Sequence, residues 1–175
     1  MIEFACKLSL IVYVEFCQLN QNHFMVGKLS QQEIEAILKD NTWGHLGCND
    51  GFNTYVYPVN FYYDGKFIMC HSQVGAKIKI MRQNSRICLQ VDEVISHTNW
   101  KSVMVLGYFQ EIQDQQERYN AMKAFEDRQM RIKRTDNYAV VDKEKENEST
   151  RSTKNLRPVI YRILIDEKTG QYEAE

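Results

Sequence analysis

The chain has 175 residues, of which 43% are hydrophobic and 11% aromatic, so it is long enough to fold as one domain around a real core. A formal net charge of -1 argues against a protein that binds nucleic acid mainly through electrostatics. We interpret the basic run at 128–134 as the solvated end of a helix.

Cysteine and histidine usage narrows the class of protein further. Five cysteines, an odd number with no CxxC pair, argue against both a disulfide framework and a zinc knuckle. The four histidines form neither an HExxH motif nor a pair at i, i+4, so we expect no metal site. Reduced thiols are typical of cytoplasmic proteins, and this is the location that we expect.

The first 26 residues are expected to be an extension that precedes a single domain at 27–175. The apolar run at 8–17 resembles a signal peptide, but Glu15 interrupts it and no A-x-A cleavage site follows. The run is also far shorter than the roughly 20 residues that cross a bilayer, so neither export nor a membrane span is expected. A strand, or an extension before a second candidate start at Met25, is our interpretation of this segment.

The first elements that the sequence predicts after the extension are a helix and three strands. Ser30 and Glu33 form an S-x-x-E capping box, which predicts a helix from Ser30 to about Asp40. After it the hydrophobic period changes from about 3.6 residues to 2, which is typical of strands. The strands are expected at 44–48, 54–63 and 66–71, with hairpin turns at 49–51 and 64–65. Pro58 cannot donate to a strand ladder, so it marks an edge, a bulge or a break that faces a ligand.

The remaining elements complete a mainly β pattern. We predict a short helix at about 75–83, strands at 86–94 and 100–112, a helix from Asp114 to about Arg128, a mobile loop at 142–155 and a closing strand at 158–166. Several strands, three helices and no βαβ alternation indicate an antiparallel β-barrel with peripheral helices.

The stretch Cys70–Asn84, CHSQVGAKIKIMRQN, is a junction between a strand and a helix. Such a junction offers unpaired backbone N–H groups and the positive end of the helix dipole, which together bind anions. Ser72 adds a hydroxyl donor and Lys77 a positive charge, so the sequence predicts a phosphate site. Structural roles explain the same residues equally well, with Ser72 as a helix cap, Gly75 in a turn and Lys77 in solvent.

Three segments together resemble a known family. The order YVYPVNFYYDG, then IMCHSQVGAKIKIMRQNSRICLQV, then WKSVMVLGYFQEI is similar to the flavin-binding split barrel related to pyridoxamine phosphate oxidase, and most of all to its nitroimidazole-resistance branch. The resemblance covers 27–113 and, more weakly, the final RPVIYRILIDEKTG. It implies an FMN-binding homodimer with two flavin sites in the groove between the subunits.

The resemblance also assigns roles to individual residues. It implies that backbone groups of Tyr57, Pro58, Val59 and Asn60 meet the edge of the flavin ring. The ribityl phosphate is expected at Ser72, Gly75, Ala76 and Lys77. His71 is expected close to the flavin as a proton donor, and Trp100 and Ser102 in the same groove. From the residues alone, His71 is equally well a satisfied buried histidine, and the tyrosines of the 54–63 strand are ordinary core residues.

Departures from the family pattern shape the expected function. The oxidases that make pyridoxal phosphate carry an Arg-x-His motif near the C-terminus, where this chain has Arg162-Ile163-Leu164, so the phosphate of pyridoxamine phosphate lacks a receptor. Where the family usually has Ser-Arg-Lys before the short helix, this chain has Gly75-Ala76-Lys77. The missing arginine weakens the expected phosphate site, so FAD as well as FMN stays a candidate cofactor.

Two classes of function remain. One is an FMN-dependent oxidoreductase that acts on a small aromatic or nitroaromatic compound with electrons from a nicotinamide donor. The other is a non-catalytic protein that binds flavin, or haem with a histidine as axial ligand.

Overall fold

A computed structural model describes residues 26–135 and 158–174, and only the backbone is described for 129 and 131–135. The extension expected at 1–25 and the loop expected at 142–155 lie outside the described residues. The elements in chain order are β1 (Gly27–Lys28), α2 (Gln31–Asp40), β2 (Trp43–Asn49), β3 (Thr54–Tyr63), β4 (Phe67–Ser72), α3 (Ala76–Gln83), β5 (Arg86–Ser96), β6 (Asn99–Glu111), α4 (Gln115–Thr135) and β7 (Val159–Glu173).

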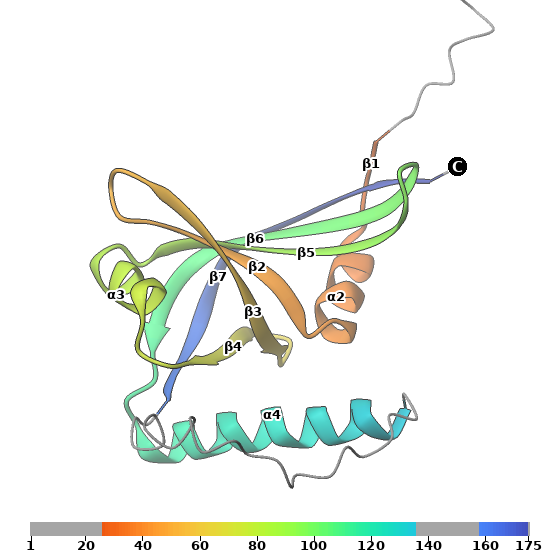
Figure 1. Ribbon diagram of the computed structural model, residues 1–175. Coiled ribbons are helices and arrows are strands. Elements are labelled where there is room, and N and C mark those ends of the chain that lie inside the picture. Colours follow the sequence, from red (N-terminus) through yellow and green to blue (C-terminus); the bar gives the residue numbers. More distant parts are fainter. Residues whose placement is uncertain (1–25, 136–157, 175) are drawn as a thin grey trace, which may run out of the picture.

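Six strands close into an antiparallel barrel. Their order is β7-β4-β3-β2-β5-β6, and β6 pairs back onto β7, while β1 adds a short strand to β7. In Figure 1 the barrel lies between α3 on one side and α2 on the other, and α4 runs beneath it. The antiparallel barrel with peripheral helices that the sequence predicts is therefore confirmed.

The predicted boundaries hold for most elements. Ser30 is the N-cap of α2, and its capping box with Glu33 is present in full. The closing strand, predicted at 158–166, is wrong at its C-terminal end because β7 continues to Glu173. These additional residues pair with β6 up to Trp100↔Glu173. Backbone hydrogen bonds therefore hold them as a strand although their side chains show no hydrophobic alternation. The helix predicted to end near Arg128 continues to Thr135.

The core fills the barrel and reaches under two helices. The fully buried side chains include Phe61, Leu89 and Tyr161 inside the barrel, and Ile78 and Met81 of α3, which close one end of it. None of the described residues is a buried charged side chain. The driving force for folding is therefore burial of apolar surface.

A polar cluster ties α2 to the barrel wall. The Tyr63 hydroxyl donates to Glu35 over 2.8 Å, and Lys168 donates both to Glu35 and, over 3.0 Å, to the Tyr63 hydroxyl. These three residues belong to β3, α2 and β7, so the cluster joins three elements that are far apart in sequence.

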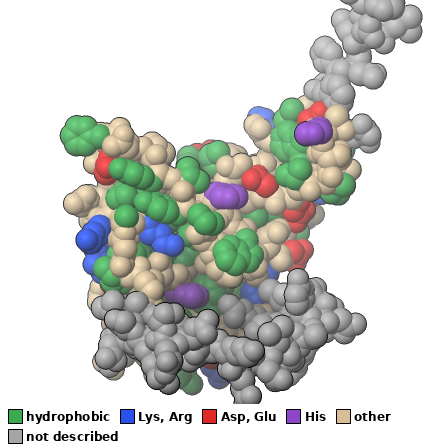
Figure 2. Space-filling model, viewed as in Figure 1, with side chains coloured by type: hydrophobic (Ala, Val, Ile, Leu, Met, Phe, Trp, Pro, Cys, Tyr) green, Lys and Arg blue, Asp and Glu red, His purple; other side chains and the backbone are tan. Residues whose placement is uncertain are grey.

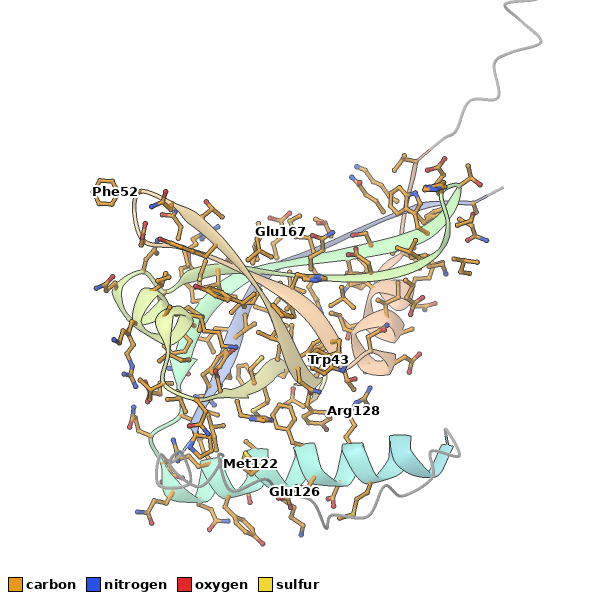
Figure 3. The ribbon with its side chains drawn as sticks, in the orientation of Figure 1. Trp43, Phe52, Met122, Glu126, Arg128 and Glu167 are labelled. Atoms are coloured by element: carbon orange, nitrogen blue, oxygen red, sulfur yellow. The ribbon has the colours of Figure 1, made fainter. Side chains whose placement is uncertain are left out.

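α4 is attached to the rest of the molecule near its start and again at Phe125 and Arg128. Near its start, the Arg118 guanidinium donates to the carbonyls of Ile112 (3.1 Å) and Pro158 (2.8 Å). Phe125 is buried, and Arg128 donates to the Lys39 carbonyl at the end of α2. Figure 3 shows Arg128 pointing from α4 toward the barrel. Within the described residues, no helix combines the length and apolarity that crossing a membrane requires.

The closure of the barrel depends on a close approach at Gly107. The register between β6 and β7 shifts at Leu106 and Gly107, and a Cβ on Gly107 would lie 2.3 Å from the Leu164 carbonyl oxygen. We therefore expect Gly107→Ala to lower the free energy of unfolding by about 1–3 kcal/mol, measured by chemical denaturation, because the backbone must move.

Gly75→Ala is the matched control, since a Cβ there meets its nearest atom at 3.9 Å. It should lose less, because only the mild preference for glycine over alanine at an N-cap is affected. Equal losses in the two variants would contradict the close approach.

Candidate functional site

The junction between β4 and α3 forms a positive corner. α3 begins at Ala76 after the N-cap Gly75, which makes no side-chain cap, and its first turn contains no acidic residue. The first helical bond runs from the Lys79 N–H to the Gly75 carbonyl over 3.1 Å, so the amides of the first turn have no partner within the helix. Together with the helix dipole and the Lys77 ammonium group, these amides create a site suited to an anion.

The side chains at this corner are partly engaged. The Ser72 hydroxyl donates to the Gln73 carbonyl over 3.0 Å, so it must rotate before it can donate to a bound anion. Lys77 is half-buried, and its charge contributes to the pKa values of both His71 and Cys70. Burial raises the pKa of the Cys70 thiol to about 12, which keeps it neutral. The positive charge of Lys77 is therefore not cancelled by an adjacent thiolate.

β3 and β4 separate next to this corner. Their pairing extends from Tyr63↔Ile68 only to Phe61↔Cys70. Beyond that point β4 stays paired with β7 as far as Ser72↔Val159, while β3 stays paired with β2 as far as its start at Thr54. The edge of β3 that faces away from β2 is thus left without a strand partner over 54–60, and the split opens toward the end of β4, just before α3 begins.

The hydrogen-bond pattern decides which backbone groups face this open edge. The Phe61 N–H donates to the Thr42 carbonyl over 2.8 Å, so Phe61 directs its backbone toward β2. Because antiparallel residues alternate, Val59 and Tyr57 also face β2, whereas Asn60 and Pro58 face the split. Proline is therefore tolerated at 58 because its missing N–H removes no bond from the ladder with β2.

This alternation divides the four residues at 57–60 into two pairs, and which of them contact a flavin stays a prediction. The resemblance implies that backbone groups of all four residues at 57–60 meet a ligand. The structure assigns the backbone groups of Tyr57 and Val59 to the pairing with β2, which leaves those of Pro58 and Asn60 for a ligand. The Val59 side chain is buried in the core, and the Tyr57 side chain packs against the core and stacks on Tyr55 at 6.3 Å.

Asn60 and His71 flank the mouth of the split. They are the next residues after the last pair, Phe61↔Cys70, and their side chains share the outer face because alternate residues of each strand point inward. The His71 ring meets the Phe125 ring of α4 edge to face, at 5.0 Å and 90°. Burial, and then the nearby Lys77 charge, lower the pKa of His71 from its ordinary value of 6.5. His71 is therefore mainly neutral at pH 7, which weakens it as the expected proton donor.

Trp100 and Ser102 are not brought to this corner within one chain. Both lie on the β5–β6 hairpin, which Figure 1 shows at the opposite side of the molecule from α3. The Trp100 indole N–H donates to Glu173 over 2.8 Å, and Ser102 lies opposite Asp92 in the pairing of β5 and β6. Their predicted place beside the other site residues stays a prediction that requires a second subunit.

Two residues at the split escaped the sequence analysis. Trp43 pairs with Asn60, and His45 pairs with Pro58. Both pairs are of the non-hydrogen-bonded kind, in which side chains lie closest. The Trp43 side chain is 63% exposed, which is unusual for an indole, and His45 is exposed too. Strand alternation extended by one residue, from Gly44 back to Trp43, would have found Trp43 and placed it on the same face as His45.

The fold and the site define a class of protein: a split barrel with an open strand edge and a helix start that has no side-chain cap and no acidic residue. The family model described as pyridoxamine 5'-phosphate oxidase matches residues 30–171, so the chain belongs to this family. An uncharacterized protein of Rhizobium meliloti (strain 1021) is 32% identical over 84 residues, which make up 48% of this chain and 56% of that protein. The chain thus spans little more than half the length of this relative.

Solved structures share the fold over nearly the whole chain. A FAD-binding protein from Mesorhizobium loti is 28% identical, with a TM-score of 0.64, and the match covers 86% of this chain and 98% of that one. A candidate 5-nitroimidazole antibiotic resistance protein from Bacteroides thetaiotaomicron is 23% identical, with a TM-score of 0.60 and coverage of 85% and 87%. A flavocytochrome from Azotobacter vinelandii is 18% identical, with a TM-score of 0.60 and coverage of 89% and 72%. The split-barrel fold recognised from sequence is confirmed.

The environment of His71 yields a prediction about pH. Because its pKa is lowered in the folded state, unfolding takes up a proton between that value and 6.5, so stability falls as pH drops through this window. We expect His71→Gln to reduce the stability lost between pH 7.5 and about pH 5, measured by urea denaturation. His97→Gln, at the exposed turn after β5, is the control. A loss in His71→Gln as steep as in the unmodified chain would show that His71 does not titrate this way.

Proposed function

We propose that this chain binds a flavin, with the phosphate at the start of α3 and the ring along the open edge of β3. The observation that carries the proposal is the coincidence of an unpaired strand edge and an uncapped, cationic helix start at one corner. The flavin binding named for the Mesorhizobium loti protein, which this chain matches over 86% of its length, supports it. FMN satisfies these two features, and FAD is the alternative because Ala76 stands where the resemblance calls for an arginine.

The residues have separate tasks in this proposal. The first-turn amides of α3, the Lys77 ammonium group and the Ser72 hydroxyl hold the phosphate. The backbone N–H of Asn60 and the carbonyls of Asn60 and Pro58 orient the ring edge. The flavin, once bound, supplies the electron transfer. The chain positions it and excludes water on the side where α4 covers His71.

Lys77 gives a direct test of the phosphate site. Lys77→Ala should weaken flavin binding by roughly 10- to 100-fold, because one charge-assisted contact contributes about 1.5–3 kcal/mol. The measurement is a fluorescence titration of flavin-free protein with FMN and, separately, with FAD. Lys79→Ala is the control, since Lys79 is exposed on the same short helix. Equal affinity in the two variants would remove Lys77 from the site.

The activity that we propose is an oxidoreductase that acts on a small aromatic or nitroaromatic compound with electrons from a nicotinamide donor. The exposed Trp43 indole beside Asn60 supports a planar substrate, because aromatic rings stack on one another. Anaerobic mixing of the flavin-loaded protein with NADPH and a 5-nitroimidazole should bleach the flavin and yield the amine. If neither occurs, reductase activity of this kind is contradicted. The alternative is a binding protein, for which the absorbance spectrum of the purified protein distinguishes flavin from haem.

The partner that we propose is a second copy of the chain. Exposed apolar side chains lie on the outer face of β2, β3 and β6, including Trp43, Val56, Met104 and Tyr108. Figure 2 shows hydrophobic side chains spread over the face formed by β2 and β3. An apolar patch on a sheet that no described helix covers is typical of a subunit interface. A dimer would also bring Trp100 and Ser102 of one subunit near the flavin of the other.

The outer face of the sheet makes the dimer testable. A double variant with Val56→Glu and Met104→Glu should be monomeric by light scattering, because burying two unpaired carboxylates costs more than the contact gains. It should also bind flavin less tightly. Tyr119→Glu is the control, since Tyr119 is an exposed aromatic side chain on α4. A monomeric unmodified chain would contradict the proposed interface.

A further inference from the structure

A cavity separate from the split lies between α4 and the β3–β4 hairpin. Its volume is about 380 Å³. An apolar cavity of about 150 Å³ already holds a benzene ring, so this space accommodates a molecule of one or two rings. None of the residues assigned to the split or to the start of α3 lines it. An inference about its ligand is therefore independent of the proposed function.

The apolar part of the cavity wall is mainly aliphatic. Ala121 and Ala124 stand one turn apart on α4, and their short side chains leave space between the helix and Met69 of β4. Ile112 and Ala121 belong to a small buried cluster with Ile160, against which Met69 packs. The cavity thus adjoins an apolar cluster that is separate from the barrel core. An apolar molecule placed there gains from leaving water.

The two aromatic rings of the wall already carry cations. Lys66 and Arg162 both lie over the Phe67 ring, each 4.9 Å from its centre. Arg128 lies 6.0 Å from the centre of the Tyr62 ring. A cationic ligand would therefore meet positive charges at the ring faces that would otherwise attract it.

The charged groups that line the cavity are engaged with protein atoms. The Arg162 guanidinium donates to Gln110 over 2.6 Å and lies 3.6 Å from the Glu117 carboxylate. One oxygen of the Asp64 carboxylate accepts two backbone N–H groups of the hairpin turn, both at 2.7 Å. A ligand ion of either sign would therefore give up its hydration without a free group of opposite charge to replace it, which is costly.

We propose that this cavity binds an uncharged, mainly apolar molecule of one or two rings. The aliphatic wall supplies the attraction, and the engaged charges disfavour ions of both signs. The occupant contacts Tyr62, whose ring meets the Phe125 ring at 6.3 Å, and Phe125 in turn meets the His71 ring at 5.0 Å. Binding in the cavity is thus two ring contacts away from the mouth of the split, and the signals of both end residues report it.

The test uses three probes that share one carbon skeleton and differ in charge: 3-phenylpropan-1-ol, 3-phenylpropanoate and 3-phenylpropan-1-amine. The full chain is titrated with each at neutral pH, and binding is followed by calorimetry and by NMR shifts of the Tyr62 and His71 rings. The alcohol should bind saturably and about tenfold or more tightly than either ion, because each ion loses hydration without a partner. If the alcohol does not saturate, or if one ion binds as tightly, the proposal is wrong.

A cavity-filling variant assigns the binding to this place. Ala124→Phe occupies the space and should abolish binding of the alcohol. Ala36→Phe, at an exposed position of α2, is the control and should bind the alcohol like the unmodified chain. Circular dichroism of both variants checks that they are folded. Alcohol binding that survives Ala124→Phe would place the alcohol elsewhere and refute the assignment.

A second variant tests the charge argument and does not depend on the first. Glu117→Gln removes the carboxylate beside Arg162, so the affinity for 3-phenylpropanoate should rise about two- to fivefold while that for the alcohol stays the same. Glu126→Gln is the control, because Glu126 is exposed on α4 and does not line the cavity. A carboxylate affinity that is equal in the two variants would show that paired charges do not set the selectivity.

Discussion

The way in which β7 closes the barrel forces β3 and β4 apart. β7 pairs with β6 along one edge and with β4 along the other, and β4 follows it as far as Ser72. β3 follows β2 in a different direction, so β3 and β4 share only the pairs next to their hairpin. The candidate site depends on this separation, because it exposes backbone donors and acceptors that a closed sheet would use internally.

The electrostatics of the corner follow from what surrounds Lys77. A cation beside a thiolate or a carboxylate would be neutralised before an anion arrived. Here burial raises the pKa of Cys70 to about 12, and His71 is mainly neutral at pH 7 because its pKa is lowered. Neither Cys70 nor His71 therefore opposes the ammonium charge of Lys77 or the dipole of α3. The positive groups at this corner are Lys77 and the first-turn amides of α3, whereas the family pattern has an arginine there in addition.

Local signals predicted most of the fold and the part of the site that is contiguous in sequence. The capping box at Ser30, the turns before Thr54 and Phe67 and the alternation in β3 are short-range features, and the structure has each of them. The last residues of β7 were missed because the segment at 167–173 is mainly polar and is held by pairing with β6. Hydropathy does not record such pairing, since it depends on a distant strand.

The rest of the site required knowledge of strand register. That Asn60 and His71 flank one opening, and that Trp43 lies beside Asn60, follows from which residues pair across strands. That the backbone groups of Tyr57 and Val59 face β2, and those of Pro58 and Asn60 face the split, also follows from register, because a strand directs alternate residues to opposite edges. A shift of one residue in the pairing of β2 and β3 would exchange the residues whose backbone groups face β2 with those whose backbone groups face the split. The sequence of one strand alone does not fix this pairing.

The position of α4 determines the side from which a ligand reaches the split. Phe125 packs against both Tyr62 and His71, so the outer face of β4 is covered at the mouth of the opening. The outer face of β2 next to it carries His45 and Trp43, both exposed. The outer face beside Asn60 is therefore open on its β2 side and covered on its β4 side. On the open side the exposed Trp43 indole pairs with Asn60, and on the covered side the His71 ring packs against Phe125 and so helps to hold α4 against the sheet.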